Sequence, residues 1–157
     1  MKLRVISVGG LKKEYARSGC ELFLGRLQRL SHCEVIEVSD AKRGRSGDVR
    51  RWRIDEAERI RRALQGTRRW VALDERGRGW RSEDLAAFVG RERDAGQAML
   101  SFVIGGPDGL DPALRDEATW RWSLGPGTLP HELARLVLLE QLYRAEAIIK
   151  GHPYHRA

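Results

Sequence analysis

The sequence predicts an α/β domain in which a mostly parallel sheet is flanked by helices. Five short apolar runs rich in β-branched and aromatic residues alternate with segments whose apolar residues recur at helical spacing. Such alternation is typical of β-α-β units, which place consecutive strands parallel in one sheet covered on both faces. The 157 residues are enough for one domain with a substantial core, but few for two.

The five expected strands are apolar runs bounded by turn residues. They are residues 3–8, which stop at a Gly-Gly pair; 35–38; 70–73; 99–104, which end in Gly-Gly-Pro-Asp-Gly; and 120–124. Ligands of parallel sheets sit beyond the carboxyl ends of the strands. The loops after Leu73, at residues 105–109 and at residues 124–129 are therefore the candidate site.

The helices between the strands are expected at residues 12–30, 48–64, 83–93, 111–117 and 130–150. Gly66 is expected to stop the second helix, and Ser82 to cap the third. The last helix is apolar around most of its circumference, so it must be buried on more than one side. We therefore expect it to form a dimer interface, with a single central core helix as the alternative.

The charge balance favours a polyanionic partner. The chain has 29 Lys and Arg against 22 Asp and Glu, a net charge of +7, which indicates rRNA or tRNA. The alternative is a set of solvated arginine-rich faces. The loop residues Lys42, Arg43 and Arg45 are the candidates for phosphate contacts, whereas Trp52 falls on the apolar stripe of its helix and is expected to face the core.

Several classes of protein are disfavoured. No apolar run reaches about 18 residues, and the alternating first residues do not resemble a signal peptide, so a cytoplasmic protein without a membrane span is expected. Cys20 and Cys33 lack metal-ligand spacing, and we expect two plain thiols, no disulfide framework and no metal site. The glycines after the first strand do not complete a dinucleotide fingerprint.

Two segments near the end of the chain carry candidate chemistry. The segment Leu124-Gly-Pro-Gly-Thr-Leu-Pro130 offers backbone amides and carbonyls that suit the edge of a purine. His131 follows it, and we expect a capping role for it in the first turn, with a place in the cleft as the alternative. The tail after Gly151 contains His152, Tyr154, His155 and Arg156, whose side chains can exchange protons or hold phosphate.

Several motifs together resemble the ribosomal large-subunit pseudouridine methyltransferase family of the SPOUT class. They are Lys42-Arg-Gly44, Leu73-Asp74, Ile104-Gly-Gly-Pro-Asp-Gly-Leu110, Trp122-Ser-Leu124, Thr128-Leu-Pro-His131, Leu142-Tyr-Arg-Ala145 and His152-Pro-Tyr-His-Arg156. The resemblance covers essentially the whole chain. It implies one SPOUT domain over residues 1–157, with a trefoil knot and the cofactor site in roughly residues 70–157, and a homodimer.

The resemblance also implies the reaction. The family transfers a methyl group from S-adenosylmethionine to N3 of a pseudouridine in a 23S rRNA stem-loop, in the large subunit or the assembled ribosome. The cofactor residues carried over by position are Leu73, Gly105, Leu124, Gly125, Pro126, Gly127, Thr128 and Leu129. The family usually has a small residue and an apolar one where this chain has Gly125-Pro126-Gly127, which puts the path of that loop in question.

In the implied reaction, the tail lies at the substrate end of the site, near the partner's cofactor. His152 and His155 rank ahead of His131 and His32 as acceptors of the N3 proton. Tyr154 is expected to stack on the base or hydrogen-bond to it, with packing against the tail proline as the alternative. Two rival functions stay open: a SPOUT methyltransferase of another RNA such as tRNA, and a non-catalytic ribosome-binding protein.

Overall fold

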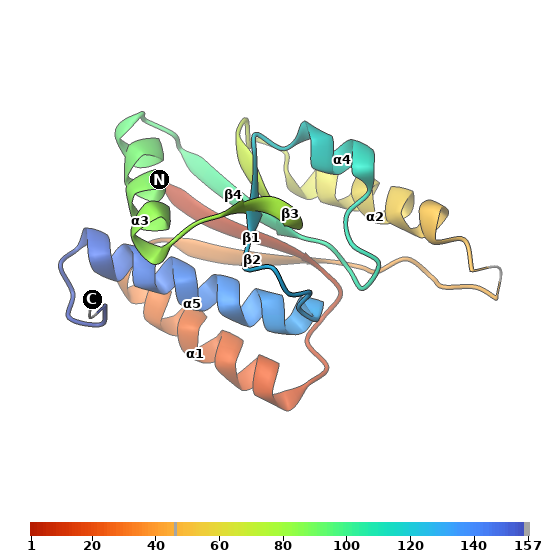
Figure 1. The fold of residues 1–157 in the computed structure, drawn as a ribbon, viewed down its shortest axis with the longest axis horizontal. Coiled ribbons are helices and arrows are strands. Elements are labelled where there is room, and N and C mark those ends of the chain that lie inside the picture. Colours follow the sequence, from red (N-terminus) through yellow and green to blue (C-terminus); the bar gives the residue numbers. More distant parts are fainter. Residues whose placement is uncertain (46, 156–157) are drawn as a thin grey trace.

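A computed structural model of the chain describes residues 1–45 and 47–155, and Figure 1 shows the fold. Five strands alternate with five helices along these residues, which confirms the predicted order of elements. The strands are β1 (Lys2–Val8), β2 (Cys33–Val38), β3 (Trp70–Gly79), β4 (Met99–Ile104) and β5 (Trp120–Ser123). The helices are α1 (Glu14–Leu30), α2 (Val49–Ala63), α3 (Ser82–Asp94), α4 (Pro112–Glu117) and α5 (His131–Ile149).

The strands form one sheet in the order β2-β1-β4-β3-β5, and every neighbouring pair is parallel. The predicted parallel sheet is therefore confirmed. Val5 of β1 lies between Val35 of β2 and Phe102 of β4, so the middle of the sheet is built from apolar side chains. Because all strands run in one direction, the loops that follow β3, β4 and β5 meet at the same edge.

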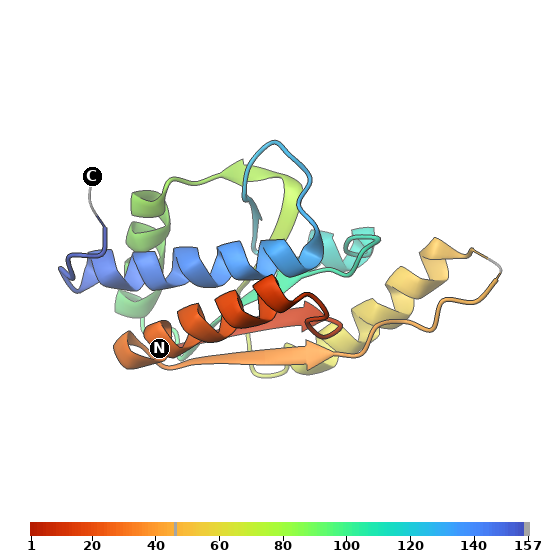
Figure 2. The same ribbon diagram turned by 90° about the horizontal axis from the view of Figure 1, so that it is seen from below.

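Helices cover both faces of the sheet (Figures 1 and 2). On one face, α1, α3 and α5 pack on a core that includes Leu3, Phe102 and Trp122. On the other face, α2 and α4 enclose a smaller core around Ile6, Ala72 and Val103. Burial of these apolar surfaces supplies the main favourable term in folding. Cys20 and Cys33 are both buried free thiols, as expected, and burial raises the pKa of Cys33 to about 12.

Helix α5 packs between α1 and α3 within a single chain (Figure 1). Leu138, Leu139 and Leu142 are fully buried there, and Glu146, also fully buried, is paired with Arg93 of α3. Helix α5 is thus largely buried without a second subunit, as expected for the alternative of a single central core helix. Among the described residues, none of the helices combines the length and apolar content needed to cross a membrane.

Two local predictions were wrong. Strand β3 does not end at Leu73 but continues to Gly79 after an irregularity, because Arg78 and Gly79 pair again with β5.

The second wrong prediction concerns the start of α3. Ser82 does not cap α3: Arg81 occupies the cap position, and the Ser82 hydroxyl donates a hydrogen bond of 2.8 Å to Gln141 of α5. The tertiary contact to α5 competes successfully with the local capping bond.

Candidate active site

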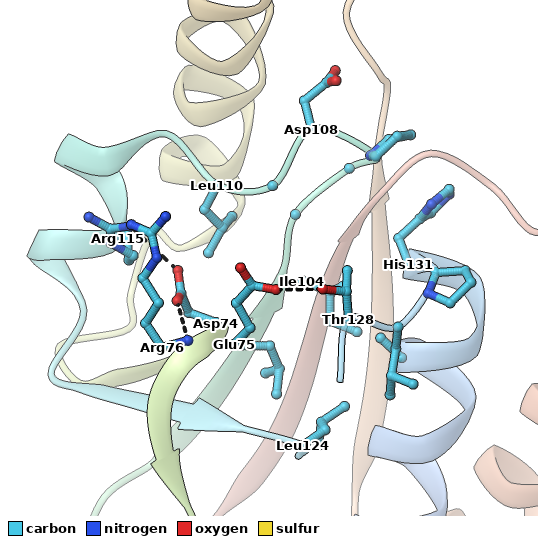
Figure 3. A pocket seen from close by; sticks show the side chains of 18 of the residues that line it. Asp74, Glu75, Arg76, Ile104, Asp108, Leu110, Arg115, Leu124, Thr128 and His131 are labelled. Carbon is cyan, nitrogen blue, oxygen red and sulfur yellow. Dashed lines mark hydrogen bonds and ion pairs between the residues drawn. The ribbon is translucent and has the colours of Figure 1, made fainter. Parts of the chain in front are cut away.

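A cavity of about 710 Å³ lies at the carboxyl ends of β3, β4 and β5, as the parallel topology predicts (Figure 3). Three segments form most of its wall: residues 73–76 of β3, residues 104–110 after β4, and the loop from Leu124 to Pro130. Residues of α2, α4, β5 and α5 complete it, among them Arg53, Arg115 and His131. The three loops that the sequence indicated therefore meet in one place.

The loop after β4 approaches itself closely at Gly105. A Cβ added to Gly105 would lie 2.7 Å from the carbonyl carbon of Gly109 and 2.8 Å from the amide nitrogen of Leu110. Both are backbone atoms, which cannot move aside as a side chain can. Gly109 has a φ of +79°, a conformation that favours glycine, and its N–H donates to the Gly106 carbonyl over 2.9 Å. The Gly-Gly-Pro-Asp-Gly segment is thus a tight turn with its backbone facing the cavity.

The irregularity in β3 creates the opposite wall. Leu73 and Arg78 both pair with Trp122, so the four residues between them bulge out of the ladder. A Cβ on Gly77 would lie 2.7 Å from the Arg121 carbonyl carbon and 2.8 Å from that of Trp122, so only glycine fits this approach to β5. The bulge brings Asp74, Glu75 and Arg76 to the cavity.

The third loop follows β5. The Ser123 hydroxyl donates to the Gly125 carbonyl over 2.7 Å and accepts from the Gly125 N–H over 3.2 Å, which fixes the first bend. The Thr128 hydroxyl donates a 2.8 Å hydrogen bond to the Glu75 carboxylate, which joins this loop to the β3 bulge (Figure 3). Among the eight carried-over cofactor residues, all but Pro126 line the cavity. The proline shapes the path of the loop without facing the space that the loop encloses.

Charged side chains around the cavity form ion pairs. Asp74 lies 3.6 Å from a guanidinium nitrogen of Arg115 and also accepts the Arg76 N–H at 2.8 Å. Asp108, in the loop after β4, receives a 2.6 Å bond from Arg43, and its backbone carbonyl accepts from Arg53 at 2.7 Å. The loop is thereby held by Arg53, which lines the cavity, and by Arg43, which lies outside it.

Arg43 comes from the predicted RNA-binding loop, which therefore borders the cavity. Lys42, Arg43 and Arg45 are exposed, and the segment that carries them extends with the start of α2 beyond the sheet (Figure 2). Trp52 does not join either core cluster, contrary to expectation; it is half-buried, with the Arg43 guanidinium 5.5 Å from its ring centroid. At this protruding end of α2 the sheet no longer lies beneath the helix, so the apolar stripe has no core to face.

His131 lines the cavity, whereas the predicted capping role is wrong: Pro130 occupies the cap position of α5, and no side chain caps it there. The next residue, Glu132, turns away and accepts the backbone N–H groups of Lys12 and Lys13, the latter at 2.9 Å. The Lys13 bond, then the Lys12 bond, lower the pKa of Glu132. Glu132 thus links the cavity end of α5 to the start of α1.

We expect Glu132→Gln to lower the free energy of unfolding by about 1 kcal/mol at neutral pH, because a neutral amide oxygen replaces a charged acceptor. A lowered pKa in the folded state means that this stability is present above the unfolded pKa and is lost as the pH falls through the folded value. Urea unfolding should therefore show the two proteins converging in acid. Glu21→Gln, at an exposed site on α1, is the control, and an equal effect of both substitutions would contradict this role for Glu132.

The tail lies far from the cavity of its own chain. It follows the carboxyl end of α5, whereas His131 begins that helix, and 19 helical residues span about 28 Å (Figure 1).

The tail residues contact α3 and α5 of their own chain. The Tyr154 hydroxyl donates to Glu140 over 3.1 Å, and the His155 ring nitrogen lies 3.2 Å from Glu83. Burial and the Glu140 bond raise the pKa of Tyr154. His152 is exposed, and Arg156 lies outside the described residues.

Asp108 lies in the candidate loop 105–109, and Arg53 lies in the basic run that begins at Lys42, but the sequence alone indicated no role in the cavity for either side chain. Glu75 directly follows Leu73 and Asp74, so the rule that ligands bind beyond the carboxyl ends of parallel strands points to it as well. Arg115 comes from α4 and had no local signal. In the described part of the chain, no group of three or more His, Cys, Asp or Glu side chains is arranged to hold a metal ion.

Comparison with known proteins identifies the class. A family model described as "Predicted SPOUT methyltransferase" matches residues 1–155. The chain therefore belongs to the SPOUT methyltransferase family. Solved structures of a probable methyltransferase from Bordetella pertussis and a probable methylase family protein from Haemophilus influenzae share the fold, both with a TM-score of 0.58. Their identities are 16% and 10%; the first match covers 92% of this chain and 96% of that one, the second 99% and 70%.

Closer similarity is to curated relatives named ribosomal RNA large subunit methyltransferase H. The protein from Nitrosococcus oceani is 40% identical over 157 residues, which is 100% of this chain and 99% of that protein. The protein from Stenotrophomonas maltophilia is 43% identical over 157 residues, with 100% of both chains covered. The resemblance read from the motifs is thereby confirmed at the level of the family.

Proposed function

We propose that this protein uses S-adenosylmethionine to methylate N3 of a pseudouridine in a 23S rRNA stem-loop of the large ribosomal subunit. The observation that carries this proposal is the cavity of about 710 Å³ enclosed by the loops after β3, β4 and β5 in a SPOUT chain. The shared name of the full-length relatives supports rRNA as the substrate. A ribosomal substrate would place the protein in the cytoplasm.

The cavity suits S-adenosylmethionine in size and lining. Sites for ligands of this size measure about 300–1,000 Å³ and combine apolar walls with a few polar groups. Leu73, Ile104 and Leu124 offer apolar surface, and the glycine-rich loops offer backbone amides and carbonyls to a purine edge. The loop after β4 can fold back on itself in the cavity wall because Gly105 lacks a Cβ. When bound, the cofactor supplies a methyl group on a positively charged sulfur.

The residues of the protein then have two tasks. They hold the attacking nitrogen in line with the methyl group, and alignment of this kind can contribute about 7–11 kcal/mol to lowering a barrier. They also provide an acceptor for the N3 proton. We assign the second task to His152 or His155 of the tail, with Tyr154 and Arg156 contacting the substrate. His131 is the histidine that lines the cavity within its own chain.

A homodimer belongs to the same proposal, because the tail, held about one helix length from its own cavity, would meet a cavity of a partner without leaving its place. Apolar surface is available for such a contact. Tyr15 and Leu22 of α1 are 52% and 49% exposed, and seven residues of spacing place them on one face of the helix. A trefoil knot in residues 70–157 belongs to the same proposal and is supported by membership of the SPOUT family.

Two exposed residues of the basic loop give a test of RNA docking. We expect Lys42→Ala with Arg45→Ala to weaken binding to ribosomal RNA by about tenfold and to reduce the slope of log affinity against log salt by about two, because each cation neutralises one phosphate. Filter binding over a range of salt concentrations measures both quantities. Arg29→Ala with Arg91→Ala removes the same charge from exposed sites on α1 and α3. An unchanged salt slope in the loop variant would contradict the docking role.

The reaction itself is tested with labelled S-adenosylmethionine and ribosomes that lack the modification. Intact ribosomes, isolated large subunits, naked rRNA and tRNA are compared as substrates. Label at N3 of a 23S rRNA pseudouridine supports the proposal. Label in tRNA alone would indicate a SPOUT methyltransferase of another RNA, and binding to ribosomes without label in any RNA would indicate a non-catalytic ribosome-binding protein.

A further inference from the structure

Three carboxylates line the cavity, and they differ in how their charge is balanced. Asp74 lies 3.6 Å from Arg115, and Asp108 lies 2.6 Å from Arg43. Glu75, in contrast, makes no ion pair within the described ranges, and its carboxylate accepts its hydrogen bond from the neutral hydroxyl of Thr128. Glu75 is therefore the cavity carboxylate whose negative charge is available to a ligand.

The backbone around Glu75 explains why its side chain is held there. Glu75 belongs to the β3 bulge, and the bulge depends on the close approach of Gly77 to β5. Figure 3 shows the Glu75 side chain reaching across from β3 toward Thr128, in front of the strand that ends at Ile104. The 2.8 Å bond from Thr128 orients one carboxylate oxygen and leaves the other without a hydrogen bond among the described residues.

We propose that Glu75 is a specificity residue that makes the cavity prefer a positively charged methyl donor over the neutral product of transfer. The inference rests on the proposed function. S-adenosylmethionine carries one net positive charge, because its sulfonium adds to a balanced ammonium and carboxylate; the product has lost the sulfonium charge and is neutral. The methyl–sulfur bond breaks, the methyl–nitrogen bond forms, and the N3 proton leaves with the charge.

The expected preference follows from Coulomb's law. An unpaired carboxylate within several ångströms of a cation stabilises it even in a partly hydrated cavity, although solvent screening keeps the effect modest. We expect this charge to contribute about three- to tenfold to the ratio of the two dissociation constants, product over donor. Loss of the attraction after transfer then helps the product to leave.

The experiment measures the affinities of S-adenosylmethionine and S-adenosylhomocysteine by calorimetry for the wild-type protein, Glu75→Gln and Glu75→Asp. The amide retains an acceptor for Thr128 and removes only the charge. We expect Glu75→Gln to weaken donor binding while product binding changes less than twofold, and Glu75→Asp to restore at least part of the preference. Glu58→Gln, an exposed change on α2, is the control and should leave both affinities unchanged.

The outcomes separate this inference from the proposed function. If Glu75→Gln leaves the ratio of the two dissociation constants unchanged, with or without an equal loss of affinity for both ligands, the role of Glu75 is overturned while the methyltransferase assignment stands. Failure of the wild-type protein to bind either ligand would instead remove the proposed function. The inference is supported if the ratio of dissociation constants, product over donor, drops in Glu75→Gln and recovers in Glu75→Asp. A merely structural role of Glu75 would not depend on whether the side chain is charged.

Discussion

Replacing Gly105 by alanine is expected to raise the dissociation constant for S-adenosylmethionine by about tenfold or more. The added methyl group would lie 2.7 Å from the Gly109 carbonyl carbon and 2.8 Å from the Leu110 amide nitrogen, so the loop itself must move. Overpacking of this kind costs about 1–3 kcal/mol, which corresponds to roughly 5- to 150-fold in an equilibrium constant. Because the displaced backbone forms the cavity wall, most of this cost falls on ligand binding.

Calorimetric titration of Gly105→Ala measures this effect, and thermal unfolding shows whether the fold survives. Gly90→Ala is the matched control, because Gly90 lies in α3 and a Cβ there meets no atom within 4 Å. That substitution should leave binding unchanged and stabilise the protein by up to about 1 kcal/mol, since alanine is the better helix former. Wild-type affinity in a folded Gly105→Ala protein would show that the loop yields freely and does not define the pocket.

The elements that the sequence predicted correctly are those specified by local pattern. The apolar runs of β1 and β4 are buried on both faces of the sheet, and such runs are recognisable without knowledge of their neighbours. The parallel order then places the following loops at one edge by geometry alone. This is why the three candidate loops were found before their contacts were known.

The features that escaped prediction depend on partners distant in sequence. Asp74 to Gly77 has the composition of a turn, and its return to the strand is set by Trp122 and Gly79 of the β3–β5 pairing. From the sequence, Ser82 is a candidate helix cap. In the structure, the Ser82 hydroxyl donates instead to the side chain of Gln141. The bond between Arg43 and Asp108 joins residues 65 positions apart, and no spacing rule indicates such a pair. Long-range geometry therefore decides the finer structure of the site.

Removal of the tail after Gly151 is expected to reduce methyl transfer by at least about 100-fold, since an acid–base group typically contributes about 10²–10⁴. Binding of S-adenosylmethionine should be retained. In its own chain the tail is held at the far end of α5: the Tyr154 ring packs 4.6 Å from that of Tyr143, and His155 contacts Glu83. None of these contacts involves the cavity wall. Single-turnover transfer to ribosomes and calorimetric titration of the cofactor measure the two quantities separately.

Mixing the two damaged proteins tests whether the site is shared between subunits. A chain cut after Gly151 keeps an intact cavity, and a Gly105→Ala chain keeps an intact tail. If the tail of one subunit serves the cavity of the other, a mixed dimer has one complete site. Equal mixing makes half of the dimers mixed, so activity, measured at cofactor concentrations below the wild-type dissociation constant, where the Gly105→Ala cavity is largely empty, should recover to about one quarter of the wild-type rate in a twofold-symmetric assembly. No recovery, with exchange of subunits verified by mass spectrometry, would show that each tail serves its own chain, which would require the tail to leave its place against α3 and α5.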